Sequence, residues 1–388
     1  MSQVLPSGID MGNIVTLSSV FQINEDDPQK SAPVKVADRN GAKESSSEVY
    51  FDNDNRLTGT AAKVVSDRNP SHCIRFIKSS IKRPFNDISE FTKSVVPSIH
   101  KDEAGEVEYV LPIGGKETHF WPPQLIGACI SDRIEDVKKE RKNTNLCLVL
   151  SVPSYYTKEQ IEDYQAGLAV SSITEYIMIR EVDSVAVDYG FYKDIYHEFD
   201  SNPRVVLFVG IGYSEAQSFA VRFSKGHYDI LAYTHSNQVS SSQVDTILFD
   251  MLLDAYDEVR DPDSDPDFRT SPTAAAKLLP VILMVKQQFS VSSLEMCEVT
   301  IPDYNEDGDD MYLELSAEDL RERIEASGML NQLHSVVQQC IADMKGIIPN
   351  QLEIMDNGIL TVPFYECVNN VCKENGVEIS SFTFMLEA

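Results

Sequence analysis

The chain has 388 residues, of which 42% are hydrophobic, and its 61 acidic and 33 basic residues give a formal net charge of −28. A chain of this length can bury a sizeable core and is expected to form two or more domains. Such a negative surface would repel nucleic acids and anionic membranes, so we expect neither as a direct partner.

The first half of the chain begins with a hairpin that contains glycine. Residues 8–12, GIDMG, precede the largely apolar run 14–20, so this segment is typical of a strand, a tight turn and a second strand. Polar residues over 21–56 predict loops and short edge strands. Residues 71–84 predict a short helix that ends at Pro84 and carries three isoleucines on one face.

Turn and capping residues indicate the later elements of the first half. They are a hairpin over 105–119 around Gly114-Gly115, a helix from Pro122 to Lys142, a buried strand over 146–153, a helix capped by Thr157 and Gln160, a strand over 176–181, and a short helix over 183–189 closed by Gly190. Strands and helices are therefore mixed in this half.

A similar glycine hairpin begins the second half. Residues 205–209 form a continuous β-branched and aromatic run, which predicts a strand buried on both faces. The next residues, 210–212, are GIG and permit a tight turn, and residues 218–223 return as a second strand. The two hairpins lie about 200 residues apart, which indicates a duplicated fold. Two such turns facing each other can hold a phosphate chain through their backbone N–H groups.

The rest of the second half also mixes strands and helices, which gives an α/β class. Residues 273–289 predict a helix that should be kinked at Pro280. The other expected elements are a strand over 227–232, a helix over 244–259, strands over 298–302 and 311–315, a helix capped by Ser316, a helix over 330–344, a strand and a turn within 352–360, and a helix over 363–375 followed by Gly376.

Neither the cysteines nor the acidic loops favour a metal site. The seven cysteines are scattered and contain no CxxC pair, so buried reduced thiols in a cytoplasmic protein are the simpler interpretation. The N-terminus lacks the features of a signal peptide. Residues 303–314 satisfy the EF-hand calcium-loop pattern, but their flanks read as strands and Asp310 replaces an apolar residue. We predict an acidic hairpin loop there and no metal site.

These features, in this order, resemble the nucleotide-binding domain of the seventy-kilodalton heat-shock (DnaK-type) chaperones, and most of all its large, one-hundred-ten-kilodalton branch. Residues 8–13 look like the first phosphate motif, and Asn13 matches the large branch. Residues 74–78 resemble the segment of the catalytic lysine, 152–157 a Val-Pro-x-aromatic-aromatic segment, and 181–190 the connecting motif.

The resemblance implies an actin-like (ribonuclease H-like duplication), two-lobed ATPase-domain fold. We expect the lobes to span residues 1–190 and 191–388. The chain ends within the family's last motif, so the closing helix, the interdomain linker and the peptide-binding domain are expected to be missing.

In this family, two aspartates, a glutamate and a lysine surround magnesium-bound ATP. The resemblance implies that Asp10, Lys78 and Glu181 are retained catalytic residues, whereas the second aspartate falls on Gly210. The glutamate that contacts the adenosine becomes Leu283. The retained nucleotide-binding positions are Gly12, Asn13, Gly212, Lys286 and Gly358, the last within the adenine turn over 357–361.

These substitutions predict an impaired site for ATP or ADP with Mg²⁺. The loss of a carboxylate at Gly210 removes one anchor of the hydrated magnesium. Tyr213 and Ser214 place side chains where backbone must meet phosphate. Glu215 adds a negative charge, and one like-charge pair at ~4 Å and an effective dielectric of ~20 costs roughly 4 kcal/mol. We expect no measurable ATP hydrolysis and weak or absent Mg-ATP binding.

Three functions remain open from the sequence. The first is a non-catalytic co-chaperone that binds a conventional heat-shock-seventy chaperone and acts as its nucleotide exchange factor. The second is a slow ATPase or ATP-binding regulator that uses Asp10, Lys78 and Glu181. The third is a scaffold in a ribosome-associated chaperone pair, beside a J-domain protein. All three place the chain in protein folding.

Overall fold

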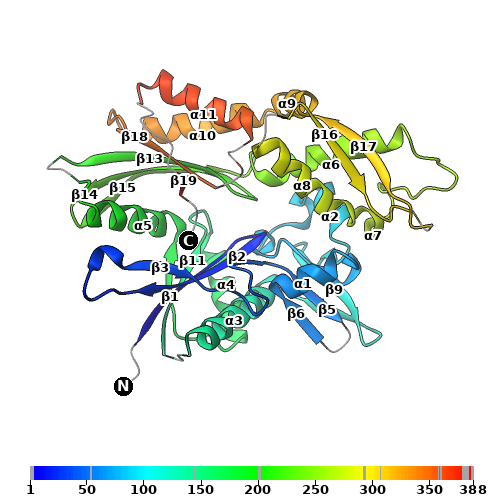
Figure 1. The fold of residues 1–388 in the computed structure, drawn as a ribbon, viewed down its shortest axis with the longest axis horizontal. Helices are drawn as coiled ribbons and strands as arrows, with labels where there is room; N and C mark the ends of the chain where they lie inside the picture. The colour runs from blue at the N-terminus through cyan, green and yellow to red at the C-terminus, as the bar shows by residue number, and fades with distance from the viewer. Residues whose placement is uncertain are drawn as a thin grey trace. The chain divides into compact units, whose positions relative to one another are not determined.

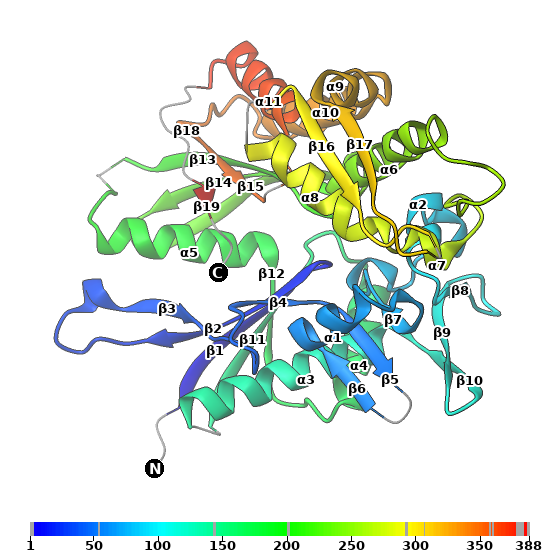
Figure 2. The ribbon, with the colours of Figure 1, turned by 45° about the vertical axis from the view of Figure 1, so that its right-hand side comes forward.

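The computed structural model describes residues 4–52, 55–142, 145–199, 202–291, 294–305, 307–356, 358, 361–377 and 384–385. The chain divides into two compact units, Met1–Val185 and Ala186–Glu387. The boundary lies within helix α5 (Glu181–Ile195), and residue 190, where we placed the lobe boundary, lies further along the same helix. Figure 1 and Figure 2 show strands and helices in both units.

The main sheet of the first unit has the strand order β12-β11-β1-β2-β3, and β4 pairs with β2. The expected hairpin joins β1 (Leu5–Met11) and β2 (Val15–Gln22) in antiparallel register. Strand β1 also pairs in parallel with β11 (Leu146–Val152), which pairs in parallel with β12 (Ile177–Arg180). Because β1 and β11 are parallel, their carboxyl ends lie at one edge of the sheet, and buried residues alternate with partly exposed ones along both strands.

Helices α3 (Pro122–Arg141) and α4 (Lys158–Val170) pack against each other in this unit. A Cβ on Gly127 would lie 2.2 Å from the carbonyl oxygen of Gly167, so the crossing has no room for a side chain. The other elements of this unit are β3 (Ala32–Lys35), β4 (Glu44–Ser46), β5 (Val49–Asp52), β6 (Asn55–Thr58), α1 (Gly59–Ser66), α2 (Glu90–Val95), β8 (Ile99–Lys101), β9 (Val107–Ile113) and β10 (Lys116–Phe120).

The prediction of a helix over residues 71–84 is wrong. The segment instead forms a 3-10 turn at Pro70–His72, the short strand β7 (Cys73–Ile74) and a second 3-10 turn at Lys78–Ser80. Phe76 has a φ of 58°, a left-handed conformation that an α-helix does not allow. The segment nevertheless packs into the core, because its three isoleucines are fully buried: Ile74, Ile77 and Ile81.

The helix predicted over 183–189 is longer than expected and does not end at Gly190. Helix α5 begins at Glu181 and continues to Ile195. A Cβ on Gly190 would meet the ring of Phe223 at 3.5 Å, an ordinary contact distance. Gly190 therefore lies at a packing contact of the helix and not at a left-handed cap.

The sheet of the second unit has the order β15-β14-β13-β18-β19. Strands β13 (Arg204–Ile211), β14 (Ala216–Ser224) and β15 (His227–Ser236) form an antiparallel meander. Strand β18 (Gln351–Met355) pairs with β13 in parallel, and β19 (Phe384–Met385) follows it. The prediction that the strand over 205–209 is buried on both faces is confirmed.

Two helices cover the two faces of this sheet. Tyr189 of α5 meets Phe208 of β13 edge to face, with ring centroids 5.5 Å apart, and Phe208 stacks on Phe219 of β14. Helix α10 (Met329–Asp343) packs on β14 and β15, where Thr234 donates a hydrogen bond to the carbonyl of Val336. Because side chains alternate along a strand, Phe208 and Gly210 share the face that α5 covers.

The helix predicted over 273–289 is interrupted, but not at Pro280. Helix α7 (Pro272–Ala275) ends before α8 (Leu278–Val291) begins. Pro280 therefore lies in the first turn of α8, where its missing N–H is one that has no intrahelical acceptor. The remaining elements are α6 (Ser241–Asp257), β16 (Met296–Ile301), β17 (Met311–Ser316), α9 (Ala317–Ala326) and α11 (Val362–Glu374).

The acidic segment over 303–314 follows β16 and continues into β17, and both strands were predicted. Ser316 accepts hydrogen bonds from the backbone N–H groups of Glu318 and Asp319, which confirms it as the cap of α9. Among the helices in the described parts of the chain, none combines the length and apolarity that crossing a membrane requires. The mixture of strands and helices in both units confirms the α/β class.

Candidate functional site

The end of β1 carries the first group of predicted site residues. Asp10 accepts a hydrogen bond at Oδ1 from the hydroxyl of Ser151 on the neighbouring strand β11. Gly12 begins the hairpin turn, and its N–H donates to the carbonyl of Val15 at 2.8 Å. A Cβ on Gly12 would lie 2.8 Å from that same oxygen, so a side chain would force the backbone to move. The turn needs glycine because its strands approach so closely.

Asn13 connects this turn to the segment that carries Lys78. Its side-chain Oδ1 accepts a hydrogen bond from the backbone N–H of Ser79 at 2.8 Å, and the residue is buried. The hydroxyls of Ser79 and Ser80 both donate to the carbonyl of Phe76, at 2.9 and 3.0 Å. These bonds hold a loop with left-handed backbone in one shape and place Lys78 next to the hairpin.

Lys78 is buried, and its ammonium lies 2.8 Å from the Glu181 carboxylate. Burial lowers the pKa of Lys78, but the charges of Glu181 and Asp10 raise it more, so that it lies well above its usual value. Lys78 therefore stays charged. Its backbone carbonyl accepts a hydrogen bond from the hydroxyl of Tyr156 at 2.6 Å, which fixes the start of the 3-10 turn.

Glu181 is the first residue of α5, and the N-terminal turn of that helix is held by Ser154. The Ser154 hydroxyl accepts a hydrogen bond from the backbone N–H of Val182 at 3.1 Å. The first unit thus brings together Asp10, Lys78 and Glu181, with Gly12 and Asn13 next to them. This cluster contains one buried cation and two carboxylates.

The hairpin of the second unit closes in the same way but is surrounded differently. The Gly212 N–H donates to the carbonyl of Glu215 at 2.9 Å, and a Cβ on Gly212 would lie 3.4 Å from that oxygen. The backbone N–H groups of Ser241 and Ser242 donate to the carbonyls of Gly212 and Tyr213, at 3.0 and 2.9 Å. The N-terminus of α6 therefore binds the hairpin itself.

Glu215 pairs with a histidine on the neighbouring strand. Its Oε2 lies 2.7 Å from Nδ1 of His235. The hydrogen bond to Glu215 raises the pKa of His235 above its usual value. From the sequence, we treated Glu215 as an isolated charge that repels the phosphates of a nucleotide. The pair with His235 weakens that repulsion when His235 is protonated.

Lys286 takes part in a compact network within the second unit. Its ammonium lies 2.5 Å from Oδ1 of Asp245, donates to the hydroxyl of Ser241 at 3.0 Å, and lies 5.9 Å from the centre of the Tyr213 ring. Asp245 is fully buried, and burial raises its pKa while Lys286 lowers it. Lys286 therefore compensates a buried carboxylate and has a structural role at this position.

A carboxylate that sequence reasoning did not assign lies beside Gly210. A Cβ on Gly210 would be 2.4 Å from Oδ2 of Asp356, the residue that follows β18. Gly358 follows closely, and a Cβ there would lie 2.3 Å from the carbonyl oxygen of Ile211. Residues 357, 359 and 360 of the expected adenine turn lie outside the described residues. The sequence placed Asp356 at a turn after a strand, but it gave no signal that this strand lies beside the glycine hairpin.

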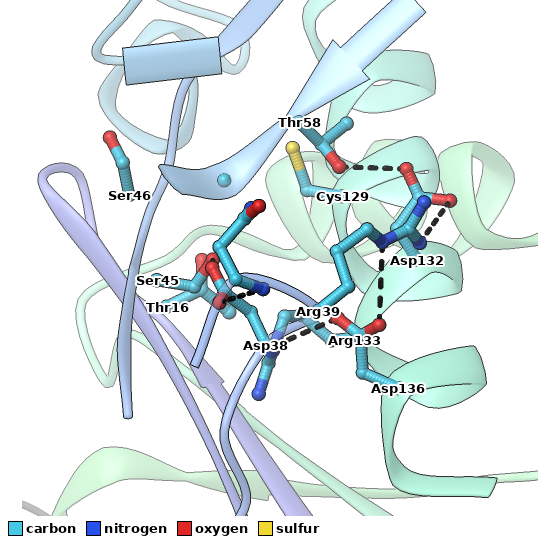
Figure 3. A pocket seen from close by; sticks show the side chains of 12 residues that line it. Thr16, Asp38, Arg39, Ser45, Ser46, Thr58, Cys129, Asp132, Arg133 and Asp136 are labelled. Carbon is cyan, nitrogen blue, oxygen red and sulfur yellow. Dashed lines mark hydrogen bonds and ion pairs between the residues drawn. The ribbon is translucent and has the colours of Figure 1, made fainter. Parts of the chain in front are cut away.

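Two cavities in the described parts of the chain are lined by other residues than these groups. Figure 3 shows one in the first unit, of about 10 Å³, the space of about one water molecule. There Arg133 and Arg39 lie 3.0 and 3.5 Å from the carboxylate of Asp136. No predicted site residue lines this cavity. The other, of about 480 Å³ in the second unit, is lined in part by Phe289, Thr361 and the start of α11.

Within the described ranges, no group of three or more His, Cys, Asp or Glu side chains could hold a metal ion by itself. Magnesium that accompanies a nucleotide does not need such a group, because it keeps several waters and is bound by one or two carboxylates and the phosphates. A magnesium nucleotide therefore depends on single, well-placed carboxylates in this chain.

Comparison with known proteins identifies relatives over almost the whole chain. Residues 6–355 match the family model described as Hsp70 protein. The chain is 22% identical over 383 residues to a heat shock protein homolog of the yeast Lachancea kluyveri, covering 97% of this chain and 52% of that protein. It is 24% identical to heat shock protein 110 of Caenorhabditis elegans, covering 79% and 39%, and 24% identical to heat shock 70 kDa protein 16 of Arabidopsis thaliana, covering 62% and 31%. The chain spans about half or less of the length of these relatives.

Proposed function

Since the chain belongs to the Hsp70 protein family, we propose that it is a co-chaperone domain that acts through protein–protein contacts and does not hydrolyse ATP. Membership of the family gives it the actin-like, two-lobed ATPase fold. Members of this family in general bind ATP or ADP with magnesium.

The observation that supports the proposal is the asymmetry between the two glycine hairpins. Phosphoryl transfer in proteins relies on charge and hydrogen-bond donors positioned around the phosphates. The first unit has Lys78 held between carboxylates. In the second, the hairpin carbonyls are bound by α6, and Tyr213 packs near Lys286. A domain in which only the first unit retains this arrangement is better suited to binding ATP than to hydrolysing it.

The first half fits a magnesium nucleotide. The turn at Gly12 has no room for a Cβ, and such a turn lets backbone N–H groups approach a phosphate. The Gly12 N–H already donates to the carbonyl of Val15, so Gly12 would shape the turn next to the phosphates, and the backbone at Asn13 would contact them. Lys78 would balance their charge, and Asp10 would face the metal. Bound magnesium would neutralise phosphate charge. The protein's own contribution is to keep Lys78 charged and fixed through Glu181 and Tyr156.

The partner that we propose is a conventional heat-shock-seventy chaperone, whose ADP release the chain would accelerate in the cytoplasm. Resemblance to the large branch at Asn13 and over 155–157, and the relative named heat shock protein 110, support this choice. A J-domain protein, in a scaffold role, is the alternative partner. Co-purification separates the two, because a J-domain partner would place the chain on ribosomes.

Release of fluorescent ADP from a purified conventional chaperone tests the exchange function. Adding the chain at saturating concentration should accelerate release, and the chain alone should show no turnover of ATP. Unchanged ADP release at saturation would contradict the exchange function. Steady ATP turnover by the chain alone would contradict the non-catalytic function.

A second candidate function is a slow ATPase or an ATP-binding regulator. The retained cluster of Asp10, Lys78 and Glu181 favours it, because Lys78 is already buried and paired. Single-turnover measurement with Mg-ATP distinguishes it from the first proposal, since slow hydrolysis that Lys78→Met abolishes would favour this candidate.

A further inference from the structure

The carboxylate of Asp356 lies in the space that a side chain on Gly210 would fill. Its Oδ2 is 2.4 Å from the Cβ position of Gly210 and 3.8 Å from that of Gly212. Strand β18 brings it there, because Gly210 pairs in register with Met355, the residue before Asp356. Two independent glycine positions therefore border one carboxylate oxygen.

The orientation of this carboxylate follows from the alternation of side chains along β13. Gly210 points to the same face as Phe208, which packs on Tyr189 of α5. An aspartate at residue 210 would direct its carboxylate to that face, and Asp356 directs one there from the next strand. Asp356 has a φ of 61°, a conformation that aspartate tolerates better than most residues.

We propose that Asp356 replaces the carboxylate missing from Gly210 and helps to hold the hydrated magnesium of a bound nucleotide. On this proposal, the second unit still has a carboxylate that faces the metal. The carboxylate comes from the residue after β18 and not from residue 210. Hydrated magnesium suits this arrangement, because one carboxylate can act on it through its waters.

This inference goes beyond the proposed function, because nucleotide binding is measured on the chain itself and does not involve the partner chaperone. It also changes the expectation drawn from sequence. Mg-ATP should bind measurably although hydrolysis is absent, and the affinity should depend on magnesium through Asp356.

Calorimetric titration of the chain with ATP, in Mg²⁺ and in EDTA, tests the proposal. Asp356→Asn keeps the shape of the side chain and removes its charge, so it should lower the affinity for Mg-ATP by about tenfold or more. In EDTA it should not lower the affinity, because without magnesium the carboxylate only repels the phosphates. Asp263→Asn removes the same charge from an exposed loop of the second unit and should change neither affinity.

A swap of the carboxylate sharpens the test. Asp356→Gly removes the side chain and suits the positive φ, so it should fold and bind Mg-ATP weakly. Adding Gly210→Asp to that variant should restore affinity, whereas Gly210→Asp alone should not improve binding, because Asp356 already fills the space.

Three results would overturn the proposal. They are native affinity for Mg-ATP no higher than in EDTA, equal or tighter Mg-ATP binding by Asp356→Asn, and no recovery in the swapped variant while it unfolds with the native transition. ADP release from the partner chaperone is measured separately, so failure here leaves the exchange function to its own test.

Discussion

The two glycine hairpins close with the same backbone bond but connect to different parts of their units. Gly12 donates to Val15 at 2.8 Å, and Gly212 donates to Glu215 at 2.9 Å. The first turn is tied by Asn13 to the Lys78 segment, whereas the second is bound by the N-terminus of α6.

The difference shows that one backbone motif can serve chemistry or structure, depending on where its neighbours place charge. In the first unit, a cation and two carboxylates gather at the strand end. In the second, Lys286 neutralises the buried Asp245 and Glu215 pairs with His235.

The largest expected effect comes from Lys78. Lys78→Met leaves the Glu181 carboxylate, 22% exposed, without its partner, and should lower the free energy of unfolding by about 3 kcal/mol. Urea denaturation measures it. Lys158→Met is the control, because Lys158 is 84% exposed beside Glu162 and should cost less than about 1 kcal/mol. Equal losses in both variants would remove the contrast between a buried pair and a surface pair.

The two hairpin glycines provide the next comparison. Gly12→Ala places a Cβ 2.8 Å from a backbone oxygen and should cost about 2 kcal/mol, because the backbone must shift. Gly212→Ala meets the corresponding oxygen at 3.4 Å and should cost less than about 1 kcal/mol. Thermal or urea unfolding checks both. If the second variant is the less stable one, the first turn is not the tighter turn.

Asn13 should show a smaller effect. Asn13→Ala leaves the N–H of Ser79 without its acceptor and should cost about 1.5 kcal/mol, because an unsatisfied buried donor is expensive. Asn13→Thr can supply a hydroxyl oxygen and should recover part of this loss. Asn331→Ala, on the exposed side of α10, is the control and should stay within about 0.5 kcal/mol. An Asn13→Ala variant as stable as this control would show that the link to Lys78 is not needed.

The smallest effect concerns pH and His235. Its pKa is raised above 6.5 in the folded chain, so the pair with Glu215 stabilises the fold fully below pH 6.5 and less as the pH rises through the folded pKa. The pair is part-exposed, so the effect on stability should stay below about 1 kcal/mol. In NMR titrations, Glu215→Gln should lower the pKa of His235, and Glu108→Gln should lower that of His119 instead. A pKa of His235 that does not respond to Glu215→Gln would mean that the pair does not form in solution.

Much of the fold was predictable because it depends on the residues of each segment. The apolar run over 205–209 predicted a buried strand, and Thr157 and Gln160 predicted a capping box that the structure contains. The segment over 71–84 failed for a physical reason. Its isoleucine spacing suited a helix, but Phe76 adopts left-handed backbone held by the hydroxyls of Ser79 and Ser80, which the spacing does not reveal.

The candidate site divides in the same way. Asp10, Lys78 and Glu181 were chosen by resemblance, and the structure places them together in the first unit. Asp356 was not chosen, because nothing in its own segment shows that it would lie over Gly210.

The sequence by itself determined where strands, turns and helix caps form and how the total charge is composed, because these depend on local polarity, side-chain shape and backbone freedom. Only the tertiary structure decided which charges meet. Glu215 pairs with His235 because β14 and β15 are neighbours. Asp356 lies next to Gly210 because β18 pairs with β13 in a fixed register. The first pairing depends on the register of one hairpin and the second on strands far apart in sequence, so neither can be read from a single segment.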